Sequence, residues 1–249
     1  MPKGQLLSGA LSAETGSPPA SASRSWPTDA PAPRRLWLRA ALLAAALSAL
    51  ACLALPSLRT PILRAAGLAL VAEDPLGPAD IVVVATGADG AGVLEAADLV
   101  ERGVTPRVAV FADPPDPVVD REFLRRGVPY ENAAARSVRQ LRALGIDANA
   151  IEEIPRAVAG TEDEGRALPG WCRDRRFRSV VVVTTSDHSR RLRRLLRRSM
   201  KGDETRVIVR ASRFSQFDPD RWWGTRLGVR TGIVEMQKLL FDVVRHPIS

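Results

Sequence analysis

A run of four valines, Val180 to Val183, is the segment that most constrains how this 249-residue chain can fold. An unbroken run of β-branched side chains indicates a strand that is buried on both faces of a sheet. The polar segment Thr184–Asp187 follows at once, and a stretch rich in arginine and leucine comes next. A buried strand that passes directly into a helix is the repeating unit of parallel α/β sheets.

Similar segments alternate along the rest of the chain. We expect strands over residues 80–85, 107–111, 150–154, 179–183 and 206–209, and helices over 92–102, 118–126, 131–144, 161–173, 189–201 and 227–245. This alternation predicts an α/β fold with a mostly parallel sheet and helices on both of its faces.

The N-terminal part of the chain is expected to lie outside this fold. Residues 1–35, rich in Pro, Ser, Ala and Gly, are predicted to be a disordered tail. Residues 36–58 include an uncharged stretch over 40–58, which as a helix would rise about 28 Å, close to the thickness of the hydrocarbon core. Arginines before this stretch favour a cytoplasmic N-terminus.

We therefore expect a single-pass transmembrane signal anchor over 36–58, and an extracytoplasmic domain over 59–249, at the inner or plasma membrane. A cleaved signal peptide and a buried helix are the alternative interpretations, and Ala49–Cys52 faintly resembles a lipoprotein cleavage site.

The net charge and the cysteines limit which ligands, disulfides and metal sites the chain is expected to have. The net charge of +8 favours anionic lipid headgroups or phosphorylated substrates, although a general bias toward arginine would produce the same charge. Cys172 is the single cysteine of the expected domain, so no disulfide is expected within it. Neither cysteine has the spacing of a metal site, and no metal is expected.

Two groups of polar residues at expected helix starts are candidates for a binding site. Thr86 and Gly87 belong to a Gly-containing turn after the first strand, which either exposes backbone N–H groups to an anion or is a tight turn that needs glycine. Thr161 and Glu164 have the spacing of a capping box, and they could equally present a hydroxyl and a carboxylate to a ligand.

The segment Thr184–Arg191 is the strongest candidate, because ligands of open α/β sheets bind just beyond the carboxyl ends of the strands. Thr185 and Ser186 could donate hydrogen bonds to an oxyanion, His188 could act as an acid or base, and Arg191 could bind a phosphate or carboxylate. In the alternative interpretation, Ser186 is the N-cap of a helix whose first turn faces solvent.

A carboxylate near the C-terminus is the last candidate. Glu235 lies in an apolar helical segment after Trp222 and Trp223 and needs a partner if it is buried, for example Arg191. An exposed Glu235 with the tryptophans packed on the sheet edge is the alternative. The arginine-rich helix over 189–201 is interpreted as a solvated face, and no motif of a nucleic-acid-binding fold accompanies it, so no nucleic acid partner is expected.

Taken together, these segments resemble the YdcF-like family, which includes the SanA and ElyC envelope proteins. The resemblance covers residues 80–245 and rests on DIVVVATGADG, the Thr161–Glu164 element, VTTSDHSRR and the Trp-rich closing helix WWGTRLGVRTGIVEMQKLL. It implies a Rossmann-like three-layer sandwich on one N-terminal membrane helix, with a polar cleft formed by these motifs. The turn after the second strand, with Asp113, and the turn at Thr86 depart from the family pattern.

The first functional hypothesis is a membrane-anchored envelope protein that binds an anionic, phosphorylated small molecule or a lipid-linked cell-wall precursor, with acid–base or hydrolytic activity. Its expected catalytic residues are His188 and Glu164. Its expected ligand-binding residues are Thr86, Gly87, Asp113, Thr161, Thr185, Ser186, Arg191 and Glu235. The second hypothesis is a non-catalytic sensor of a nucleotide-like ligand or an envelope scaffold, and the sequence leaves the identity of any cofactor open.

Overall fold

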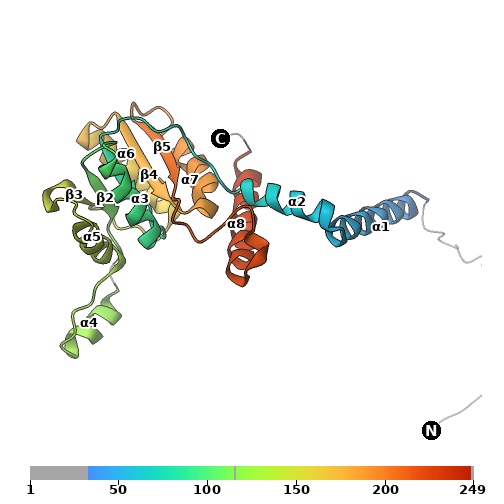
Figure 1. Cartoon of the computed structure of the whole chain (residues 1–249), viewed down its shortest axis with the longest axis horizontal. Helices are drawn as coiled ribbons and strands as arrows, with labels where there is room; N and C mark the ends of the chain where they lie inside the picture. Colours follow the sequence, from blue (N-terminus) through green and yellow to red (C-terminus); the bar gives the residue numbers. More distant parts are fainter. Residues whose placement is uncertain (1–32, 115, 248–249) are drawn as a thin grey trace, which may run out of the picture. The chain divides into compact units, whose positions relative to one another are not determined.

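Five parallel strands form one sheet in the part of the chain that the computed structural model describes, residues 33–114 and 116–247 (Figure 1). The strands lie in the order β3-β2-β1-β4-β5. Their bounds are β1 (Ile81–Val84), β2 (Val108–Phe111), β3 (Ile151–Ile154), β4 (Ser179–Thr184) and β5 (Arg206–Ala211). Because the strand order reverses between β1 and β4, the carboxyl ends of these two strands form a topological switch point.

The helices connect the strands in the predicted alternation. Their bounds are α3 (Asp89–Glu101), α4 (Pro117–Arg125), α5 (Ala133–Ala143), α6 (Thr161–Arg175), α7 (Ser186–Ser199) and α8 (Arg226–Arg245), with short 3-10 turns η1 (Ala148–Ala150) and η2 (Trp222–Gly224). Each expected strand and helix is present. The helices α3 and α7 each begin three residues earlier than predicted, at Asp89 and Ser186.

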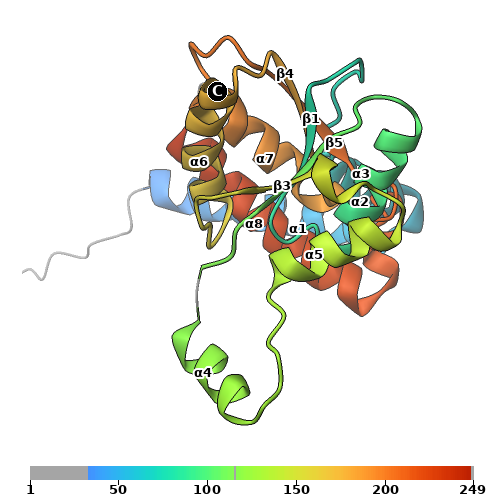
Figure 2. The same ribbon diagram turned by 90° about the vertical axis from the view of Figure 1, so that its left-hand side faces the viewer.

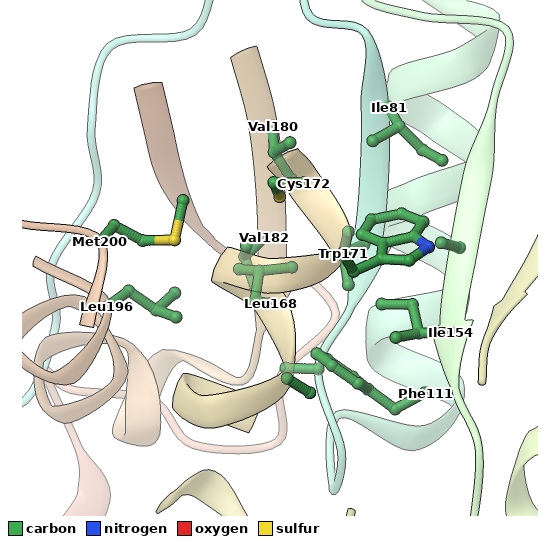
Figure 3. Packing of buried hydrophobic residues seen from close by; sticks show 14 of the residues in the cluster. Ile81, Phe111, Ile154, Leu168, Trp171, Cys172, Val180, Val182, Leu196 and Met200 are labelled. Atoms are coloured by element: carbon green, nitrogen blue, oxygen red, sulfur yellow. The ribbon is translucent and has the colours of Figure 1, made fainter. Parts of the chain in front are cut away.

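Two apolar clusters, one on each face of the sheet, form the core. Val180 and Val182 of β4 pack with α6 and α7 (Figure 3). Val181 and Val183 point the other way, toward α3 and α5. Successive side chains of a strand alternate between the faces, so the valine run is buried on both sides as predicted. The α/β prediction is therefore confirmed, and the architecture is that of a Rossmann-like sandwich.

A third, smaller cluster joins α2 (Pro56–Leu68) to α8 through Trp222. The indole N–H of Trp222 donates a hydrogen bond to the carbonyl of Leu63, 2.7 Å away. Its ring lies so close to Gly232 that a Cβ there would be 2.7 Å from a ring carbon. Glycine at this position of α8 therefore allows the helix to approach the ring.

The N-terminal part differs from the prediction. The helix α1 (Pro33–Ala54) already includes residues 33–35, which the sequence assigns to the disordered tail, and the rest of that tail lies outside the described residues. The expected anchor over 36–58 is divided between two helices, because α1 ends at Ala54 and α2 starts at Pro56, where a missing N–H suits a first turn. None of the described helices combines the length and the apolar character needed to cross a membrane.

The chain separates into two compact units, Met1–Ala51 and Cys52–Ser249. The described part of the first unit consists of α1 residues. The second unit contains the sheet and its helices, and α2 belongs to it. Within this second unit, α4 stands apart from the other helices on a long connection between β2 and α5 (Figure 2). None of the α4 residues is buried.

Candidate functional site

Most of the polar residues singled out in the sequence lie at the switch point between β1 and β4. The two strands pair in register, with Val84 opposite Val183, so their carboxyl ends are level. Thr86 and Gly87 follow β1, and Thr185 and Ser186 follow β4. The helix α3 begins at Asp89 and α7 begins at Ser186, so side chains and helix N-termini meet at one edge of the sheet.

Three side chains from three helices form a hydrogen-bonded chain at this edge. Thr161, the first residue of α6, places its Oγ1 3.2 Å from Nε2 of His188 in the first turn of α7. Nδ1 of His188 lies 3.3 Å from Oε2 of Glu235 in α8. His188 and Glu235 are both buried, whereas Thr161 is partly exposed. We call Thr161, His188 and Glu235 the relay.

The relay can take either of two proton arrangements, since an imidazole has two tautomers. With the proton on Nδ1, His188 donates to Glu235, and its Nε2 can accept the hydroxyl proton of Thr161. This arrangement of hydroxyl, imidazole and carboxylate is the geometry by which a base activates a hydroxyl and a third group orients the base.

Two cations share the carboxylate of Glu235 with His188. Nε of Arg191 lies 3.1 Å from Oε2, and Nζ of Lys238 lies 2.6 Å from Oε1. Burial alone would raise the pKa of Glu235, but the hydrogen bonds from His188 and Lys238 and the charge of Arg191 lower it to about 2. Glu235 is therefore a fixed anion in the interior, and it is not exposed as the alternative interpretation requires.

The carboxylate of Glu164 joins α6 to the turn after β1. Its Oε1 accepts hydrogen bonds from the backbone N–H of Thr86 at 2.5 Å and from the Thr86 hydroxyl at 2.8 Å. No described residue donates to Oε2, although this atom is buried. Burial raises the pKa of Glu164. A buried carboxyl of raised pKa beside a histidine is typical of functional sites.

The capping-box interpretation of Thr161 and Glu164 is wrong. The N-cap residue of α6 is Gly160 and not Thr161, and a glycine has no side chain that could cap the helix. The Thr161 hydroxyl contacts His188, and Glu164 contacts Thr86, so both side chains leave their own helix for other elements. The alternative interpretation of Ser186 as an N-cap is also wrong, because Thr185 occupies that position in α7.

A cleft of about 540 Å³ opens at the same edge of the sheet. Its walls are the first turns of α3, α7 and α8 and the segment 214–217 that follows β5. Gly87 lines the cleft with a φ of +75°, a conformation that glycine adopts without strain.

The helices α3 and α7 begin at this cleft without caps. Among the described residues, the side chains of the N-cap residues Ala88 and Thr185 accept no hydrogen bond from a backbone N–H of the first turns, and each of these turns carries one acidic residue, Asp89 in α3 and Asp187 in α7, that lines the cleft. First-turn N–H groups without a cap, combined with the positive end of the helix dipole, favour a negatively charged ligand.

The structure does not bring all of the predicted site residues into this cleft. Gly87 and Thr185 line it, whereas the relay residues and Glu164 do not. Arg191 lines a separate hollow of about 150 Å³ together with Lys238 and Arg245. The candidate site therefore has two parts, a cleft with helix N-termini and an adjacent buried polar cluster.

Two predicted ligand-binding residues have their polar atoms engaged within the protein. The Ser186 hydroxyl lies 2.9 Å from Oγ of Ser215 and 2.9 Å from the carbonyl oxygen of Phe217, and thereby fixes the cleft wall. Oδ2 of Asp113 accepts a hydrogen bond from the backbone N–H of Ala134 at 2.9 Å, at the start of α5. These contacts give Ser186 and Asp113 structural roles.

Sequence reasoning missed several residues of the site. Asp187 lines the cleft, and burial raises the pKa of its carboxyl. Its place in the polar run after β4 was the available signal. Lys238 is one helical turn from Glu235, a spacing at which side chains meet. The segment 214–217 has no periodicity or motif that would have revealed it. Among the described residues, no group of His, Cys, Asp and Glu side chains could hold a metal ion.

No model of a protein family matches the chain, and no curated protein matches it.

Proposed function

We propose that this domain binds an anionic small molecule, of the phosphorylated class, in the cleft between the carboxyl ends of β1 and β4. The observation that carries the proposal is the pair of uncapped helix N-termini at the cleft. By contrast, the side chains of Asp116, Asn132 and Thr225 cap α4, α5 and α8. Within the described residues, the helices α2 and α6 also begin without a side-chain cap, at Leu55 and Gly160, and α8 is capped although its first turn lines the cleft. The proposal therefore rests on the position of α3 and α7, whose first-turn N–H groups lie where a ligand oxyanion can accept their hydrogen bonds.

We further propose that the relay performs acid–base chemistry on this ligand. Thr161 is the exposed end of the relay, so its hydroxyl, or a water in its place, is the group whose proton His188 can take. Glu235 holds the imidazole in the orientation needed and stabilises its charged form. Arg191 and Lys238 offset the negative charge of Glu235 and attract an anionic ligand toward the relay.

The resemblance to YdcF-like proteins, the envelope role and the membrane location stay predictions of the sequence. A non-catalytic sensor is the second candidate, and the full engagement of Ser186 within the protein favours it. Binding without turnover would support the sensor, and turnover would support the enzyme.

Ligand binding is tested by calorimetry with pyrophosphate, a nucleoside diphosphate and a sugar phosphate. The variant Gln216→Glu places a negative charge in the cleft without a change of shape, and Gln140→Glu is its control on α5, outside the cleft. We expect Gln216→Glu to weaken binding at least about tenfold, the result of one opposed charge contact, and Gln140→Glu to leave it unchanged. Equal affinities, or no binding of any anion, would overturn the proposal.

Chemistry is tested by release of phosphate from each ligand that binds. His188→Ala should abolish turnover. The control is His246→Ala, which changes the chain's other histidine, located after α8, and should leave turnover unchanged. Arg191→Ala should raise KM more than it lowers kcat. Turnover that survives His188→Ala would exclude the relay as the source of the chemistry while leaving the binding proposal intact.

A further inference from the structure

The exposed face of α8, extended by α2, is an apolar and basic surface that lies mostly outside the candidate site, although Leu227 also lines the cleft and Phe241 and Arg245 line the hollow beside Arg191. We infer that this surface docks on a lipid bilayer that contains anionic lipids. The inference is independent of the proposed ligand chemistry, because it rests on the solvent-facing sides of α8 and α2. The opposite sides of these helices carry Glu235 and pack against Trp222.

Large apolar side chains cover the outer side of α8. Phe241 is 65% exposed and Val244 is 73% exposed. The exposed apolar residues of the helix include Leu227, Ile233, Val234, Leu240, Phe241 and Val244. Positions three, four and seven residues apart share one side of a helix, so these residues form a stripe along α8. Leu58 and Ile62 add exposed apolar side chains on α2.

The charges on these two helices are of one sign on their exposed sides. Arg226, Arg230 and Arg245 lie on the exposed side of α8. The helix α2 has no acidic residue and contains Arg59 and Arg64, of which Arg64 pairs with Asp220. The two acidic residues of α8 are occupied, Glu235 in the relay and Asp242 with Arg194 and Arg198 of α7. An apolar stripe bordered by arginines is the pattern of helices that lie in the headgroup region of a membrane.

The charge pattern favours lipid over a second copy of the chain. In a symmetric dimer through this surface, the same arginines would meet across a two-fold axis, and like charges would oppose association. An anionic lipid surface attracts every one of them. The position of α2 directly after the apolar helix α1 in the sequence is consistent with this partner.

The experiment measures the depth of single nitroxide labels in the full chain bound to vesicles of equal parts phosphatidylcholine and phosphatidylglycerol. The labels are placed at Leu240→Cys and, as a matched control, at Leu124→Cys, because both leucines are exposed on helices and Leu124 lies on α4. Cys52 is replaced by serine in both proteins. Cys172 is buried and burial raises the pKa of its thiol to about 12, so it does not compete for the label.

We expect the label at position 240 to become several-fold more accessible to oxygen than to a water-soluble nickel chelate when vesicles are added, and the label at position 124 to stay in water. Arg226→Glu with Arg230→Glu should reverse the change at position 240. This readout reports the α8 surface itself, whatever other part of the chain contacts the vesicle.

Three results would overturn the inference. The label at 240 could stay aqueous on vesicles, or both labels could enter the bilayer alike. The label at 240 could also become immobilised without vesicles as the protein concentration rises, which would identify a second copy as the occupant. A thermal melt of each variant shows that the fold is retained.

Discussion

The β1/β4 half of the sheet's carboxyl edge is built differently from the connection that follows β2. Beyond β2, the connection to α5 satisfies the helix starts with its own side chains, since Asp116 caps α4 and Asn132 caps α5. Beyond β1 and β4, α3 and α7 begin without a side-chain cap in the described part of the chain. There the polar side chains reach across between helices instead, as Thr161 does to His188.

The difference shows where the sequence lacks interactions that would stabilise the helix starts. A missing cap typically costs about 1 kcal/mol of helix stability, and the chain leaves two caps out at the same cleft. The buried carboxylates follow the same division, because Glu164 and Glu235 lie at the β1/β4 half, whereas Glu122 on α4 is solvent-facing. A region that gives up stability in several ways at once is where a ligand is expected to restore it.

The largest expected effect comes from removing the carboxylate that organises the buried cluster. Glu235→Ala leaves His188, Arg191 and Lys238 without their shared acceptor, and we expect a loss of about 3 kcal/mol in the free energy of unfolding. Glu122→Ala is the matched control, since this exposed carboxylate also binds two arginines and its loss should cost much less than that of Glu235. Urea denaturation measures both, and equal losses would contradict the comparison.

The carboxylate of Glu235 should also make the free energy of unfolding depend on pH. The pKa of Glu235 falls from 4.5 to about 2 on folding, so its contribution is complete above pH 4.5 and is lost as the pH falls toward 2. The wild type should therefore lose about 3 kcal/mol more than Glu235→Gln over this window. Denaturation curves at several acidic pH values test this, and parallel pH profiles for the two proteins would refute it.

A smaller effect distinguishes the helix starts themselves. Asn132→Ala removes the hydrogen bond to the N–H of Ala135 and should cost about 1 kcal/mol. Thr185→Ala removes a side chain that makes no cap to α7, and should change the free energy of unfolding by less than about 0.5 kcal/mol. Thermal melts without ligand compare them, and an equal loss from Thr185→Ala would mean that α7 is capped after all.

The smallest effect on stability is expected at Glu164. Its pKa is raised on folding, so the wild type should lose stability as the pH rises above 4.5, because the unfolded chain ionises first. Glu164→Gln removes this loss while its carbonyl still accepts from Thr86, so the melting temperature near neutral pH should stay equal or rise. A clear fall in melting temperature would show that the ionised carboxylate is needed for folding.

The fold could be predicted from the sequence, because the valine run and the helix-forming segments beside it are patterns of residues that are neighbours in the chain. The sequence was not sufficient to predict the partners of the site residues. The Thr161–Glu164 spacing fits a capping box and a binding site equally well, and the outcome depended on the packing of α6 against the turn at Thr86, far away in the sequence. Ser186 likewise found its partners in the segment 214–217, which carries no pattern.

The N-terminal part shows a different limit. An apolar, alanine-rich stretch with flanking arginines fits a membrane helix by composition, but composition does not reveal that the stretch is divided at Pro56. The second of the two helices belongs to the folded domain through Leu63 and Trp222. Hydropathy cannot predict such a contact, because it joins an indole N–H to a backbone carbonyl far away in the sequence.

The packing of Trp222 limits how far the chain can be shortened at its N-terminus for biochemical work. The tryptophan ring is held between α2 and α8, with Gly67 and Gly232 against it. A version of the chain that starts at Arg59, just after the expected anchor, would cut α2 within its first turn and loosen this packing. A version that starts before Leu55 keeps the whole helix, and its tryptophan fluorescence, to which Trp222, Trp223 and Trp171 contribute, then offers a built-in signal that the domain has formed.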